Sequence, residues 1–284
     1  MKRKIVNLVE DTPGNTGCLY EHGLSFYIET ERHKLLMDSG ATDMFWRNAD
    51  RLGIDLKAVD TLVLSHGHYD HAGGILTFAE RNPKAAIYLR STVGEEYYHL
   101  TKAREKYIGI DRRILDLKQC VFVQEDCTKI DDELFLFSHI TGKNGAATDS
   151  LQIKQQFKRR TANGFVQDTF EHEQCLVIWQ ENYSILLSGC AHSGILNILE
   201  RYHEVFHSYP DVVISGFHMI KKEEYQEDEI SAIKETASAL MQTGAVFYTG
   251  HCTGQAAYAW MKDIMGDRLR DIHSGDTLLS SDSL

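Results

Sequence analysis

Three histidines and an aspartate fall within six residues of one short stretch, Leu62–Gly74, which reads LVLSHGHYDHAGG. Protonated imidazoles repel one another when crowded, so such a cluster is favourable when neutral rings surround a bound cation. Imidazole nitrogens and one carboxylate are ligands for zinc or, with more oxygen donors, for manganese or iron. A strand over Thr61–Ser65 would end at His66 and place Asp70 and His71 on the first turn of the next helix. The stretch therefore predicts a metal site whose ligands are His66, His68, Asp70 and His71.

An apolar strand, a glycine and a histidine occur together three more times in the last third of the chain. The predicted strands, with a preceding partner over Cys175–Trp179, are Ser184–Ser188, Val212–Ser215 and Ala245–Tyr248. Ligand residues gather on loops at strand ends. We expect His192 and His251, each before a predicted helix (Ser193–Leu199 and Thr253–Lys262), to be ligands. We expect His218 to contact substrate or donate a proton.

The elements that must position these residues alternate between strands and helices. Short apolar runs bounded by turns predict strands over Lys4–Val9, Leu24–Glu29, Lys34–Met37, Thr61–Ser65, Ala86–Leu89, Cys120–Val123 and Leu134–Ser138. Helices are predicted over Asp43–Leu52 and Gly74–Arg81, and the polar, aromatic Thr92–Arg113 has a helical period that predicts a surface excursion. Thr141–Asn163 is expected to be a loop. This order predicts an α/β fold with two mixed sheets covered by helices on both outer sides.

The composition is that of a globular protein, with 284 residues, 43% hydrophobic and 25% charged. No apolar run has transmembrane length, and the first residues resemble a strand more than a signal peptide. Six cysteines without a C-x-x-C pair favour reduced thiols, so we expect a cytoplasmic protein. A net charge of −11 disfavours nucleic acid and anionic membranes as partners and leaves a small-molecule substrate. The oligomeric state is left open.

LSHGHYDHAGG resembles the metallo-β-lactamase-fold metallohydrolases, and the resemblance runs over nearly the whole chain. Five further pieces resemble one branch of this family, named after a dihydropteroate-synthase-type activity in archaeal methanopterin biosynthesis. They are HGLSFYIET (His22–Thr30), LLMDSG (Leu35–Gly40), LSGCAHSGI (Leu187–Ile195), SGFHM (Ser215–Met219) and TGHCTG (Thr249–Gly254). The resemblance implies a four-layer αββα sandwich forming a single domain over residues 1–284. The excursions 92–113 and 141–163 would shape the rim of its active site.

The resemblance also implies a dinuclear metal centre. Its two ligand sets would be His66, His68 and His192 for one ion, and Asp70, His71 and His251 for the other. Asp38, in Asp-Ser-Gly, would orient a ligand ring through a hydrogen bond. We expect two divalent ions, zinc first, with manganese, iron or magnesium as alternatives.

One departure concerns the residue that bridges the metals in most of this family, an aspartate that follows a strand and a glycine. This chain has Cys190 in the matching place, where a thiolate could bridge or a small buried side chain could pack. His22, Ser25 and Thr253, in the motifs that carry the resemblance, are assigned to substrate binding.

The expected reaction is hydrolysis of an ester or phosphoester in a small, anionic substrate by a metal-activated hydroxide, which Asp70 would orient. No G-x-S-x-G motif offers a nucleophilic serine. A pterin-linked synthase and a non-catalytic metal-dependent sensor or binding module stay open as alternatives. The acidic balance counts against nucleic-acid processing. A flavo-di-iron oxidoreductase would need glutamate where this chain has His68.

Overall fold

The computed structural model describes residues 4–142 and 153–280. These residues form two compact units. Of the described residues, the first unit comprises 4–95, 108–125 and 272–280, and the second comprises 96–107, 126–142 and 153–271. The expectation of one domain over residues 1–284 stays a prediction.

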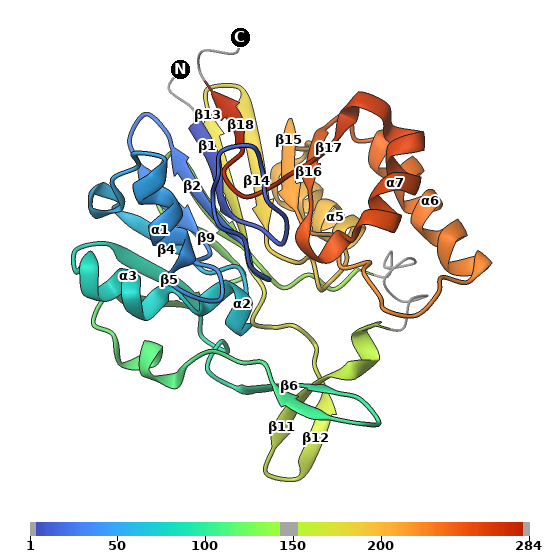
Figure 1. The fold of residues 1–284 in the computed structure, drawn as a ribbon, viewed down its shortest axis with the longest axis horizontal. Helices are drawn as coiled ribbons and strands as arrows, with labels where there is room; N and C mark the ends of the chain where they lie inside the picture. The colour runs from blue at the N-terminus through green and yellow to red at the C-terminus, as the bar shows by residue number, and fades with distance from the viewer. Residues whose placement is uncertain (1–3, 143–152, 281–284) are drawn as a thin grey trace. The chain divides into compact units, whose positions relative to one another are not determined.

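A seven-stranded sheet with the order β18-β1-β2-β3-β4-β5-β8 forms the first unit. Figure 1 labels its strands β1, β2, β4, β5 and β18 and its helices α1, α2 and α3. Its strands are β1 (Lys4–Val9), β2 (Ser25–Glu29), β3 (Lys34–Met37), β4 (Thr61–Val63), β5 (Ala86–Arg90), β8 (Cys120–Val123) and β18 (Thr277–Ser280). Its helices are α1 (Met44–Arg51), α2 (Tyr69–Ala72) and α3 (Ile75–Arg81), with 3-10 turns η1 (Leu56–Ala58) and η2 (Arg112–Asp116). Strands β3, β4, β5 and β8 run parallel, whereas β18, β1, β2 and β3 pair antiparallel.

The core of the first unit lies between this sheet and helices α1 and α3. Alternate strand residues point to the same face of a sheet, and this face supplies Val6, Leu8, Leu36, Leu62 and Ile87, which pack with Phe45, Ala49, Ile75 and Phe78 of the helices. Since β3 and β4 are parallel neighbours, their carboxyl ends meet at one edge of the sheet. The residues that follow these two strands, Asp38 and Ser65–His66, therefore emerge side by side.

The second unit contains a seven-stranded sheet with the order β17-β16-β15-β14-β13-β10-β9. Its strands are β9 (Cys127–Lys129), β10 (Leu134–Phe137), β13 (Cys175–Gln180), β14 (Tyr183–Ser188), β15 (Val212–Ser215), β16 (Val246–Thr249) and β17 (Leu269–Asp271). Its helices are α5 (Ile195–Phe206), α6 (Glu227–Met241) and α7 (Gln255–Met265), with 3-10 turns η3 (Ile153–Gln156), η4 (His251–Thr253) and η5 (Gly266–Arg268). Strands β14 to β17 are parallel, so β14, β15 and β16 all end at the same edge.

A four-stranded sheet, β12-β11-β6-β7, also belongs to the second unit and corrects two predictions. The strands are β6 (Glu96–Leu100), β7 (Glu105–Tyr107), β11 (Phe157–Thr161) and β12 (Gly164–Gln167). The helical period predicted over Thr92–Arg113 was wrong, because β6 and β7 lie there. The loop predicted over Thr141–Asn163 was wrong where β11 lies, and residues 143–152 of that range lie outside the described part of the chain. Strand pairing is favoured over a helix here because it brings aromatic rings together across the sheet. The ring centroid of Tyr98 lies 5.4 Å from that of Tyr107 and 5.2 Å from that of Phe165.

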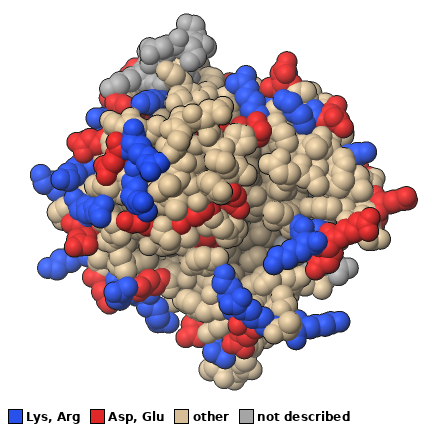
Figure 2. All heavy atoms as spheres, in the orientation of Figure 1, with Lys and Arg blue, Asp and Glu red and all other residues tan. Residues whose placement is uncertain are grey.

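Charged side chains of both signs lie on one face of the molecule. On the face drawn in Figure 2, Lys and Arg side chains are interspersed with Asp and Glu. Within the described residues, no helix is both long and apolar enough to cross a membrane.

Candidate metal centre

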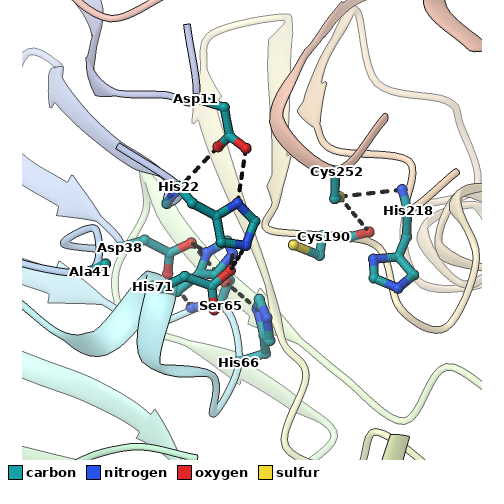
Figure 3. Close-up of polar contacts among 12 residues, drawn as sticks. Asp11, His22, Asp38, Ala41, Ser65, His66, His71, Cys190, His218 and Cys252 are labelled. Carbon is teal, nitrogen blue, oxygen red and sulfur yellow. Dashed lines mark hydrogen bonds and ion pairs between the residues drawn. The ribbon is translucent and has the colours of Figure 1, made fainter. Parts of the chain in front are cut away.

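Asp38 joins the ends of β3 and β4 in the first unit. Its backbone has a left-handed φ of 62°, and its side chain is fully buried. The carboxylate accepts hydrogen bonds from the Ser65 backbone N–H and the Ser65 hydroxyl, both at 2.7 Å, and lies 2.6 Å from Nδ1 of His71 (Figure 3). A carboxylate bound to one ring nitrogen fixes the orientation of the imidazole. Asp38 is therefore placed to direct Nε2 of His71.

The three histidines of the HGHYDH motif lie close together and are almost completely buried. The His66 ring centroid lies 4.6 Å from that of His68 and 4.1 Å from that of His71. The Ser65 hydroxyl lies 2.8 Å from Nδ1 of His66. Nε2 of His71 lies 3.8 Å from Oδ2 of Asp70. Buried imidazoles this close, with a carboxylate beside them, form a donor set that suits a divalent transition metal.

Two glycines after the motif explain how the short helix α2 reaches its position. A Cβ on Gly73 would lie 2.0 Å from the carbonyl oxygen of Ala41, and one on Gly74 would lie 2.4 Å from that of Ser39. The Ser39 backbone N–H donates to the His71 carbonyl at 2.8 Å, and its hydroxyl donates there at 2.9 Å. Close backbone approach therefore ties the histidine segment to the turn that follows β3.

His22 lies between two carboxylates of the first unit. Its Nδ1 is 2.8 Å from Oδ2 of Asp11, and its Nε2 is 3.4 Å from Oδ2 of Asp70. Asp11 also accepts a hydrogen bond from the Gly23 backbone N–H at 3.2 Å. The His22 side chain is 58% exposed, which distinguishes it from the buried motif histidines. The sequence placed His22 at the substrate but missed Asp11, which belongs to no motif.

Three strand ends of the second unit carry the other predicted residues. Cys190 and His192 follow β14, His218 follows β15, and His251 follows β16. The histidines at 218 and 251 have left-handed φ values of 51° and 49°, as does Ala191 at 50°. Such values are uncommon outside glycine and are typical of functional corners. A sulfur of Cys190 and a ring nitrogen of each of His192 and His218 lie within 4.8 Å of one another.

Cys252 is a further donor in the second unit that sequence reasoning did not single out, although it lies in the TGHCTG motif. Its sulfur, that of Cys190 and a ring nitrogen of His251 lie within 4.8 Å of one another. Burial raises the pKa of the Cys252 thiol, but its hydrogen bond with Cys190 and the nearby His218 and His251 outweigh burial. The pKa therefore lies well below its ordinary value.

His192 is held by side chains that no motif indicated. The Phe170 ring stacks on it at 4.7 Å with an interplanar angle of 11°, and the Phe157 ring meets it edge-on at 5.2 Å. The carboxylate of Glu173 is buried and accepts the backbone N–H groups of His192, at 2.7 Å, and Ser193, at 3.0 Å. These contacts fix both the ring and the turn that bears it.

Two residues assigned to substrate binding are bonded within the fold. The buried Ser25 hydroxyl donates to the Asp38 carbonyl at 3.0 Å. Oγ1 of Thr253, equally buried, accepts from the Phe217 backbone N–H at 2.8 Å and lies 2.6 Å from Oγ1 of Thr249. Their burial and bonds thus account for both hydroxyls without a substrate.

Each unit therefore gathers part of the predicted site. The first brings together Asp38, His66, His68, Asp70 and His71, with His22 beside Asp70. The second gathers Cys190, His192, His218 and His251 at its strand ends. The first group offers buried imidazole and carboxylate donors and the second offers buried imidazole and thiol donors, and all of these donor types fit divalent transition metals.

Comparisons with known proteins relate the whole chain to one family. The family model described as metallo-beta-lactamase superfamily matches residues 20–152. Tm1679, a crystal structure described as a metal-dependent hydrolase of the beta-lactamase superfamily, is 30% identical, with a TM-score of 0.79, over 98% of this chain and 100% of that chain. The 7,8-dihydropterin-6-methyl-4-(beta-D-ribofuranosyl)-aminobenzene-5'-phosphate synthase of Methanocaldococcus jannaschii is 28% identical over 96% of this chain and 95% of its own length.

A more distant structure, the metallo-beta-lactamase fold protein YhfI from Bacillus subtilis, shares the fold alone. It is 11% identical, with a TM-score of 0.56, over 98% of this chain and 99% of its own. The predicted fold class and the predicted family, with its synthase-named branch, are confirmed by these likenesses. On the strength of its full-length similarity to Tm1679, the chain belongs to the metallo-beta-lactamase superfamily.

Proposed function

We propose that this protein hydrolyses an ester or phosphoester bond in a small anionic substrate at a centre of two divalent metal ions, zinc first. The observation that carries the proposal is the buried convergence of the motif histidines, with Asp38 bonded to His71. Divalent ions supply Lewis acidity, which favours deprotonation of water at neutral pH and polarises the scissile bond. The proposed ligands are those the family resemblance implies: His66, His68 and His192 for one ion, and Asp70, His71 and His251 for the other.

The residues around Asp70 can orient a nucleophile and remove its proton. Oδ2 of Asp70 lies near both His71, at 3.8 Å, and His22, at 3.4 Å. Once Asp70 has taken the proton of the nucleophile, Nε2 of His22 can receive it from the resulting carboxylic acid, and Asp11 stabilises the charged ring through Nδ1. Because His22 is the exposed member of this group, it is the residue of the first unit best placed to meet a substrate.

Metal analysis of the purified protein, paired with a hydrolysis screen, tests the proposal. The substrates are a phosphodiester, a phosphomonoester and a lactone, each assayed with metal-loaded and chelator-treated protein. We expect close to two ions per chain and turnover of at least one substrate that is lost on chelation. Protein that binds metal but turns over none of them would refute the hydrolase proposal and favour a metal-dependent sensor.

A pterin-linked synthase is the second candidate, because the similarity to the Methanocaldococcus jannaschii synthase covers nearly both chains. In that case the bound metals would assist departure of a leaving group while an aminobenzene-type nucleophile attacks. The discriminating assay offers a pterin-type electrophile together with an aminobenzene. Formation of the coupled product without hydrolysis of the ester panel would favour the synthase.

A further inference from the structure

His218 is a buried histidine that the fold itself does not satisfy. His218 is only 8% exposed, and neither nitrogen of its ring has a hydrogen-bond partner within the described residues. A buried polar atom without a partner costs free energy that a folded protein normally recovers through a bound group. His71 of the first unit differs, because Asp38 holds its Nδ1. The ring of His218 is therefore prepared for a ligand.

The backbone around His218 is fixed in a strained shape that aims the ring. Its φ of 51° is left-handed, and its N–H donates to the Cys252 sulfur at 3.3 Å. The Met219 and Ile220 N–H groups both donate to the Cys252 carbonyl at 2.9 Å. A Cβ on Gly216 would lie 2.4 Å from the Cys252 sulfur, so only glycine permits this approach. The corner after β15 is thus held against the corner after β16.

The surroundings of the ring contain metal donors. The His218 centroid lies 4.3 Å from that of His192, and the Phe157 ring meets both imidazoles edge-on, at 5.3 and 5.2 Å. A nitrogen of each imidazole and the Cys190 sulfur lie within 4.8 Å of one another. Two ligands of one tetrahedral zinc ion lie roughly 3.3–3.8 Å apart, because zinc bonds are about 2.0–2.3 Å long. A small shift of these side chains would let the Cys190 sulfur and the two imidazole nitrogens bind one ion.

We propose that His218 is a metal ligand that acts with His192 at the strand ends of the second unit. The proposal rests on the metal dependence in the proposed function and replaces the expected role of His218 as a proton donor. A proton donor needs only one ring nitrogen near the substrate. That role would not explain why the His192 imidazole and the Cys190 sulfur lie beside His218. A role as a ligand accounts for the neighbouring donors, for one of the two unpartnered ring nitrogens and for the strained corner together.

The test measures metal binding in native protein and in the variants His218→Ala and His218→Gln. His203→Ala is the control, since His203 is an exposed histidine of α5 in the same unit. Each protein is stripped with chelator and titrated with zinc against a chromophoric competitor. Each is also loaded with cobalt(II), whose visible absorption reports the number and type of ligands. Near-ultraviolet circular dichroism establishes that each variant is folded.

We expect both His218 variants to lose one ion, or at least tenfold in affinity for it, and to show an altered cobalt spectrum. His203→Ala should match native protein. Full zinc affinity and a native cobalt spectrum in folded His218→Gln, even with activity lost, would overturn the proposal and leave a proton donor. If His218→Ala does not fold, His218→Gln decides alone. Native protein that binds no metal would overturn the proposed function as well.

Discussion

Replacing Asp38 by asparagine tests whether this carboxylate orients His71 for metal binding. Asparagine keeps the shape of the side chain, but only one of its two ends accepts hydrogen bonds. If the amide oxygen faces the Ser65 N–H, at 2.7 Å in the native protein, the NH₂ group faces Nδ1 of His71. The ring must then carry its proton on Nε2. That tautomer cannot bind a metal ion through the nitrogen directed towards Asp70.

The size of the effect follows from these contacts. Losing the partner of a ligand ring lowers metal affinity about 10- to 100-fold, which is about 1.4–2.8 kcal/mol. The fold should also lose about 1–3 kcal/mol, because a charge-assisted bond between buried groups is broken. Asp38→Ala would remove the acceptor of the Ser65 backbone N–H and of Nδ1 of His71. A larger share of its effect would therefore fall on the free energy of unfolding. Asparagine is the sharper substitution.

The assay is zinc titration against a chromophoric chelator, with denaturant unfolding of the apo-protein measured in parallel. Asp60→Asn is the matched control, because Asp60 also binds a histidine, with its Oδ1 2.8 Å from Nδ1 of His33, and accepts from the Lys34 N–H at 2.9 Å. That pair lies outside the site, so its loss should leave zinc affinity unchanged. Native affinity in folded Asp38→Asn would refute the reasoning and reduce Asp38 to a turn residue.

Three further outcomes are expected. The double substitution His66→Ala and His68→Ala should remove most bound metal, measured by elemental analysis, and full retention would contradict the ligand assignment. His192→Ala should abolish activity and loosen one ion, whereas Cys190→Ser should keep its metal and at least a tenth of the activity, a barrier increase of about 1.4 kcal/mol at most; the opposite pattern would identify the thiolate as the bridge. Glu173→Gln should lower the free energy of unfolding by about 1–3 kcal/mol, because its amide oxygen can accept only one of the two backbone N–H groups that the carboxylate holds. Equal denaturant midpoints for Glu173→Gln and native protein would contradict this role.

Local patterns predicted much of the fold because most of its strands are short apolar runs bounded by turns. Strands β3 and β8 begin and end where Lys34–Met37 and Cys120–Val123 placed them. The prediction for Thr92–Arg113 failed because β6 pairs with residues 157–161, and pairing between distant segments leaves no local signal in the sequence. Aromatic residues at near-helical spacing therefore gave the wrong period.

The site shows the same division between local and distant information. The histidine motif was readable because its donors come from one corner of the chain. The role of Glu173 could not be predicted from the sequence. Its carboxylate lies 19 residues from His192 along the chain and accepts backbone N–H groups whose positions are defined only by the folded turn. Phe170 was missed for the same reason: its ring stacks on His192 from a segment without a motif. Such supporting contacts depend on tertiary structure.

The pairing of β18 with β1 has a consequence for synthesis of the chain on the ribosome. Lys4 pairs with Ser280 and Val6 with Thr277, so this edge of the first sheet is completed by residues made more than 270 positions later. At about 5–20 residues per second, β1 waits on the order of tens of seconds for its partner. Throughout that interval its outer N–H and C=O groups form an open strand edge, the kind of surface on which nascent chains aggregate. Chaperone contact with the nascent chain should therefore matter most before residue 280 emerges.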